Sequence, residues 1–181
     1  MRRIFRRQLR KAFKPSVPPI LQEANLALDK GDFGRAAELF EQIAHVAEGR
    51  GGPRAPLFYL QAGRARLLAG QIHLGIPSLQ RGLDLLAQRK QFPRLRSIGT
   101  RLIAELNEHG LRDEATAIEA WLRSVLPSMP SFDVQSPHAK HPSLPTHCPS
   151  CGAPLKPDEV EWLDEFTAEC AYCGSPIRED A

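Results

Sequence analysis

Between residues 20 and 126, apolar residues recur at intervals of three and four, and charged and other polar residues fill most of the positions between them. This spacing is typical of amphipathic α-helices, because 3.6 residues per turn bring such positions to one face. Turn-forming residues interrupt the pattern at Gly31, 49–56, Gly70, 91–93 and Gly110. The pattern therefore predicts helices at residues 20–30, 33–48, 57–69, 76–89, 95–109 and 112–126.

The predicted helices repeat as pairs around three glycines, and a small residue lies five positions after each glycine. A glycine permits a left-handed turn between two helices, and a small residue lets the second helix approach the first closely. Successive motifs start 39 and 40 residues apart, a distance typical of helical repeat proteins. Three helical hairpins are therefore expected, with the motifs Gly31-Asp-Phe-x-x-Ala36, Gly70-Gln-Ile-x-x-Gly75 and Gly110-Leu-Arg-x-x-Ala115.

The first of these units, GDFGRAAELFEQIA, resembles the middle of a tetratricopeptide (TPR) repeat, and residues 61–63 and 79–83 of the second unit are compatible with it. The resemblance covers residues 17–126. The spacing exceeds the family's ~34 residues, and the family's tryptophan and closing proline are missing, so the repeats are degenerate. The resemblance implies a mainly α fold, a short right-handed solenoid of three hairpins that binds a protein partner or peptide.

Residues 1–14 form a segment with seven Lys/Arg and no acidic residue, whereas the remainder of the chain holds all 21 acids and is net acidic. Helical periodicity places Phe5, Leu9 and Phe13 opposite the cations, which predicts a basic amphipathic helix. Three interpretations stay open: binding to an anionic membrane surface, binding to nucleic-acid phosphates, or a tail or cap on the chain's own repeats. The predicted membrane or partner contacts are Arg3, Phe5, Arg6, Arg7, Leu9, Arg10, Lys11 and Phe13.

Residues 127–146 contain five prolines together with serine and histidine, a composition that predicts an extended linker. A linker of this kind would leave the C-terminal segment tethered to the helices, with few contacts between them.

All four cysteines of the chain lie beyond this linker, as two Cys-x-x-Cys pairs that are each followed by glycine. Each pair can direct two thiolates at one metal ion, and the spacing between the pairs suits a four-thiolate zinc site. Residues 147–178 resemble a zinc ribbon with CPxCG-type knuckles, with expected strands at 160–162 and 166–170. The predicted ligands of one structural zinc ion are Cys148, Cys151, Cys170 and Cys173.

Other uses of these cysteines stay open. Thiolates also bind iron, as in rubredoxin-like sites, and the pairs could act in redox chemistry or form disulfides. Disulfides are disfavoured because the N-terminus has no apolar segment of signal-peptide length. Nucleic-acid binding by the ribbon is also disfavoured, since residues 147–181 hold eight acids and only two basic side chains.

The sequence contains no recognisable catalytic motif, and no stretch approaches the ~20 apolar residues that a membrane span needs. We therefore expect a non-enzymatic, cytoplasmic adaptor that binds protein partners through its repeats and touches the inner membrane face, if at all, through residues 1–14. The alternatives are a redox or iron-sensing protein that uses the four-cysteine site, and a nucleic-acid-associated factor that uses the basic segment.

Overall fold

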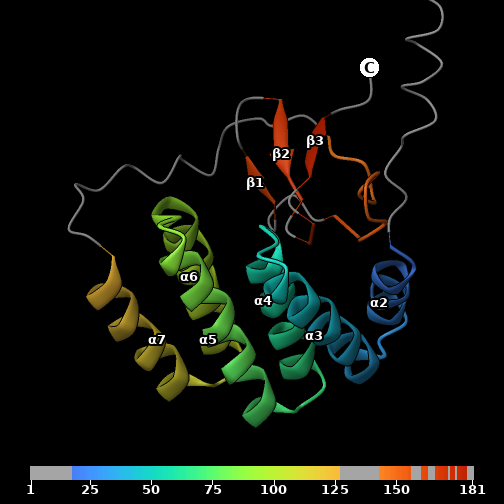
Figure 1. The fold of residues 1–181 in the computed structure, drawn as a ribbon. Coiled ribbons are helices and arrows are strands. Elements are labelled where there is room, and N and C mark those ends of the chain that lie inside the picture. The colour runs from blue at the N-terminus through green and yellow to red at the C-terminus, as the bar shows by residue number, and fades with distance from the viewer. Residues whose placement is uncertain are drawn as a thin grey trace, which may run out of the picture.

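The fold is mainly helical, with a small sheet beside one end of the helices (Figure 1). The computed structural model describes residues 18–126, 143–155, 160–162, 166–170, 172–173 and 175–178. The predicted basic helix at residues 1–14 and residues 127–142 of the predicted linker lie outside these ranges. The described helices are α2 (Pro19–Asp29), α3 (Phe33–Gly49), α4 (Ala55–Leu68), α5 (Ile72–Gln88), α6 (Phe92–Glu108) and α7 (Arg112–Val125).

The six predicted helices are confirmed, and most of their ends agree within three residues. The largest difference is the start of α5, which was expected at residue 76 and lies at Ile72. Proline is favoured in the first turn of a helix and disfavoured in its interior. In the structure Pro77 is inside α5 and exposed, so the helix accepts the loss of one backbone hydrogen bond there.

The helices are joined by turns of one repeated type. Gly31, Gly70 and Gly110 have φ angles of 75°, 73° and 77°, which confirms the left-handed turns predicted for them. At the first turn, the N–H groups of Gly31 and Asp32 donate to carbonyls of the last turn of α2 at 3.0 and 2.9 Å. This pattern is the Schellman motif, which satisfies carbonyls left unpaired at a helix end. The turn from α5 to α6 has the same hydrogen bonds, but Lys90, with φ 56°, takes the glycine position.

Helix α4 lies at the centre of the array, packed against both α3 and α5, and nearly all of its side chains are buried. The closest approach is between α4 and α5. A Cβ atom added to Gly63 would lie 2.5 Å from the Cγ of Leu79, and one added to Gly75 would lie 3.0 Å from the carbonyl oxygen of Gly63. The prediction that a small residue at position 75 allows close helix packing is therefore confirmed.

The sheet has three short antiparallel strands in the order β1 (Glu161–Trp162), β2 (Thr167–Glu169) and β3 (Pro176–Arg178). Residue Trp162 pairs with Ala168, and Ala168 pairs with Ile177. The two predicted strands are confirmed as β1 and β2. The strand β3 was not predicted, because a three-residue segment that begins with proline carries no alternating pattern of its own.

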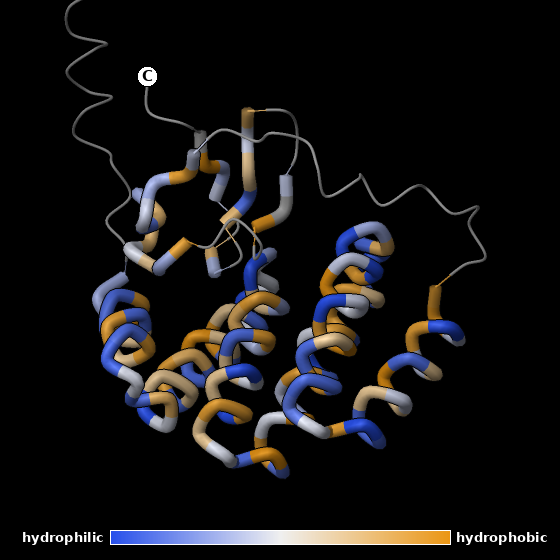
Figure 2. Tube along the Cα trace, turned by 180° about the vertical axis from the view of Figure 1, so that it is seen from behind, coloured by the Kyte–Doolittle hydropathy of each residue, from blue (hydrophilic) through white to orange (hydrophobic). Residues whose placement is uncertain are grey.

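Two groups of buried apolar side chains form the core. One group joins α4, α5, α6 and α7, and the other joins α2, α3 and α4 to the cysteine-containing segment. Figure 2, which shows the molecule from behind, has apolar and polar residues mixed along each helix, as expected for amphipathic helices.

Candidate metal centre

The first cysteine pair lies in a tight turn that the backbone closes on itself. The Cys148 N–H donates to the Ala153 carbonyl, and the Gly152 N–H donates to the Cys148 carbonyl, both at 2.8 Å. Gly152 has φ 74°, a left-handed conformation that favours glycine. An isolated bridge between His147 and Pro154 continues the pairing outward. The turn thus holds Cys148 and Cys151 on one short, rigid loop.

The second pair follows directly from the sheet. Cys170 is the residue after β2, and its N–H donates to the Ser175 carbonyl at 2.9 Å. Ser175 in turn precedes β3, so the loop between the two strands carries Cys170 and Cys173. The hydrogen-bonded strands therefore position the second pair, in the way that the backbone turn positions the first.

The four sulfur atoms converge on one point. All four Sγ atoms lie within 4.8 Å of one another, and the pairs Cys148–Cys173 and Cys151–Cys170 are each 3.8 Å apart. Four sulfurs at ~2.3 Å from a central zinc ion would lie about 3.8 Å apart at the corners of a tetrahedron. A disulfide would need ~2.05 Å. The separations therefore fit a shared metal ion and not two disulfides.

The thiols strongly perturb one another's ionisation. Contacts with Cys151 and Cys170, together with a backbone hydrogen bond from Ser150, lower the pKa of Cys148 to about 7. The pKa of Cys173 is also lowered, most strongly by the contact with Cys148 and less by those with Cys151 and Cys170. The pKa values of Cys151 and Cys170 are raised, in both cases chiefly by Cys148. A bound cation would allow all four to ionise together, because it offsets the repulsion between thiolates.

The donor set suits a soft or borderline metal with a closed coordination sphere. All four cysteines are buried, and sulfur is the ligand type preferred by zinc and by iron–sulfur centres. The neighbouring His147 is exposed and its ring hydrogen-bonds Thr146 Oγ1 at 3.1 Å, outside the sulfur cluster. Four protein ligands would leave no coordination position for water or substrate.

The cysteine-containing segment is not merely tethered, as the proline-rich linker had suggested. Cys148, Cys151, Cys170 and Cys173 belong to the same buried cluster as side chains of α2, α3 and α4. Within that contact the Asn25 side chain, 2% exposed, donates to the Cys151 carbonyl at 2.7 Å. The expectation of few contacts was wrong because composition describes the linker and says nothing of the surfaces at its two ends.

Two arginines make further contacts between the helices and the ribbon. Arg54, just before α4, donates to the Ser175 hydroxyl at 3.3 Å. Arg94 in α6 pairs with Glu169 in β2. The acidic character of the ribbon was visible in the sequence, but no cationic partner for it among the helices was predicted. The described structure places a partner in α6.

The aromatic residues of the ribbon divide between core and surface. Tyr172 is buried in the cluster that contains the cysteines, whereas Phe166 is 65% exposed.

The predicted contact residues between Arg3 and Phe13 lie outside the described residues. Among the helices that are described, none is both long and apolar enough to cross a membrane.

Comparisons with known proteins give no relative for this chain. No protein-family model, no curated protein and no solved structure matches it.

Proposed function

We propose that the protein is a non-enzymatic adaptor, in which TPR-like helical hairpins bind a protein partner and a structural zinc ribbon stabilises one end of the hairpin array. The observation that carries this proposal is the position of the four-sulfur cluster, which shares its buried core with α2, α3 and α4. A metal at this position would link the ribbon to the helices, because the four cysteines pack in one buried cluster with side chains of α2, α3 and α4.

The sulfur geometry supports one zinc ion, held by Cys148, Cys151, Cys170 and Cys173. The zinc ion would supply charge compensation for the thiolates and free energy for folding a segment that is too short to have a core of its own. A closed set of four thiolates favours this structural role over catalysis.

The repeated turns support a short right-handed solenoid of the TPR type. The turns at Gly31, Gly70 and Gly110 share one conformation and recur at the spacing of the sequence motif. Exposed apolar side chains support a protein or peptide as the partner, since soluble surfaces seldom retain them in groups without a use. Leu68, Ile72 and Leu74, all at least 37% exposed, flank the turn between α4 and α5.

The place of action that we propose is the cytoplasm, with residues 1–14 available for contact with an anionic membrane surface. Seven cations and an apolar face in this segment support that contact. We do not propose nucleic acid as a ligand of the ribbon, whose net charge is acidic.

Metal analysis of the purified full-length protein tests the zinc centre. We expect one zinc per chain by elemental mass spectrometry, and loss of zinc in Cys151→Ser together with a lower melting temperature of the helices. Visible-absorbing iron at unit stoichiometry would favour the redox or iron-sensing alternative, and metal-free protein with two disulfides would also contradict the zinc assignment.

Quantitative crosslinking of the zinc-loaded protein in cells tests the adaptor role. We expect a defined protein partner whose complex can be reconstituted from purified components. Failure to reconstitute any such complex would overturn the adaptor proposal and leave the zinc assignment intact.

A further inference from the structure

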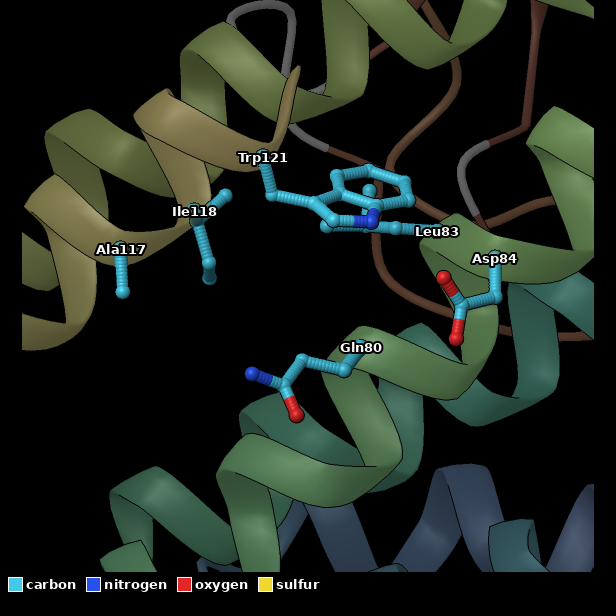
Figure 3. A pocket seen from close by; sticks show the side chains of 6 residues that line it. All are labelled: Gln80, Leu83, Asp84, Ala117, Ile118 and Trp121. Atoms are coloured by element: carbon cyan, nitrogen blue, oxygen red, sulfur yellow. The ribbon is translucent and has the colours of Figure 1, made fainter. Parts of the chain in front are cut away.

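A groove separates α5 from α7, the second helices of two successive hairpins (Figure 3). Its volume is about 250 Å³, below the ~300–1,000 Å³ typical of sites for small molecules and cofactors. A groove of this size is better suited to a single long side chain of a partner. The residues that line it are Gln80, Leu83, Asp84, Ala117, Ile118 and Trp121.

The groove contains a carboxylate, Asp84, that forms no hydrogen bond or salt bridge with the described residues. Asp84 is half-buried. The nearest cation along α5, Arg81, forms its salt bridge with Glu48 of α3, and only its longer-range charge attraction reaches Asp84. Figure 3 shows the Asp84 carboxylate directed into the groove on the same side as the Trp121 ring. A half-buried carboxylate that is not already in a salt bridge is a favourable place for a cationic group, because desolvation strengthens the attraction between charges.

The rest of the groove lining is largely apolar and aromatic. The indole of Trp121 lies over the groove, and Leu83 and Ile118 lie beside it (Figure 3). An indole face attracts cations, and it also packs well against the flat guanidinium group of arginine. The amide of Gln80, which is exposed at the edge, can bond to the backbone of a bound peptide.

We infer that this groove is a binding site for an arginine side chain of the protein partner, with the guanidinium group paired with Asp84 and its flat face stacked on Trp121. The inference rests on the proposed adaptor function and specifies where and how a partner would be recognised. Charge selects the occupant: an acidic segment would face the Asp84 carboxylate at close range, and a purely apolar one would bury that carboxylate without a partner. Arginine fits better than lysine, because it offers several donors in a plane as well as a face for stacking.

The site can be tested on the full-length protein with a minimal ligand. The probe is N-acetyl-L-arginine N-methylamide, followed through the indole N–H signals in ¹⁵N nuclear magnetic resonance spectra. The chain has two tryptophans, so the variant Trp162→Phe assigns the Trp121 signal. We expect a saturable shift of that signal with the arginine probe, and a much weaker response to the citrulline analogue, which has the same shape but no charge.

Asp84→Asn keeps the size of the side chain and removes its charge. It should weaken probe binding by about tenfold or more, because charge-assisted hydrogen bonds are among the strong ones. The matched control is Asp113→Asn, which removes an exposed acid from the first turn of α7, outside the groove, and should leave binding unchanged.

Three results would overturn the inference: no shift of Trp121 up to the solubility of the probe, equal responses to arginine and citrulline, or undiminished binding by Asp84→Asn. These failures differ from failure of the adaptor proposal. A protein partner that binds equally well to wild type and Asp84→Asn would leave the adaptor role standing and refute the groove as its arginine site. If the arginine probe shifts the Trp121 signal but no partner complex can be reconstituted, the arginine site would stand and the adaptor role would be refuted.

Discussion

Replacing Asn25 with alanine tests whether the ribbon is docked on α2. The variant removes the donor of the 2.7 Å hydrogen bond and leaves the Cys151 carbonyl without it in a buried position. Such a loss costs about 1–3 kcal/mol. Two effects offset part of that cost: the buried Asn25 Oδ1, which has no hydrogen-bond partner among the described residues, is removed as well, and alanine favours the helix by up to ~0.7 kcal/mol. The net destabilisation should be about 1–2 kcal/mol.

For a chain of this length, 1 kcal/mol corresponds to a shift of roughly 2–4 °C in melting temperature. Asn25→Ala should therefore melt about 2–8 °C below wild type by far-ultraviolet circular dichroism. It should also release its metal faster to a chromophoric chelator, because the loop that carries Cys151 loses its anchor. The control is Asp29→Ala, an exposed change in the last turn of the same helix, which should alter stability by less than ~0.5 kcal/mol. Unchanged melting and unchanged metal release in Asn25→Ala would refute the docking.

Three further changes test the helix array. Gly63→Ala should destabilise the protein by about 1–3 kcal/mol, because the added Cβ would overlap the Leu79 side chain. The control Gly34→Ala, whose added Cβ would have no atom within 4 Å, should stabilise the protein slightly. Urea unfolding compares the two variants, and equal effects would contradict the close α4–α5 contact. Lys90→Gly should raise the melting temperature, because Lys90 holds a left-handed conformation that costs a non-glycine residue ~1 kcal/mol or more. A melting temperature below that of wild type would contradict the left-handed conformation of Lys90. Burial, and to a smaller extent a hydrogen bond to the Glu48 carboxylate, raise the pKa of Tyr59 from 10 to about 12. The stability that the neutral Tyr59 contributes should therefore be complete below pH 10 and decline as the pH rises towards 12. Tyr59→Phe should abolish this decline in urea unfolding measured from pH 10 to 12, and an identical decline in the variant would refute the assignment.

The helices could be predicted from the sequence because their signals are local. Apolar periodicity located all six, and glycines marked three of their turns. The turn at Lys90 has the same backbone form without a glycine, so its conformation could not be read from residue type. The start of α5 was misplaced for a related reason, since Pro77 is tolerated in a position where proline usually ends or begins a helix.

That the four cysteines come together was also predictable, because two Cys-x-x-Cys pairs have few other uses. Their surroundings were not, since the contacts of Asn25 with Cys151 and of Arg94 with Glu169 join residues far apart in sequence. A partial signal for Asn25 did exist: it lies one turn after Leu21, on the apolar face of α2, where a polar residue needs a buried partner. Finding which partner required the tertiary structure.

The contact between Asn25 and Cys151 has a consequence for biosynthesis. It joins α2 to a cysteine loop that leaves the ribosome more than a hundred residues later. At 5–20 residues per second, α2 waits on the order of 10–30 s before the second cysteine pair has been made. During that interval the apolar surface that later meets the ribbon is uncovered, and under the proposed zinc centre it would remain so until metal is captured. The supply of metal to the nascent chain would thus limit how soon the N-terminal half of the core is complete, and a shortage would expose that half to proteases and to aggregation.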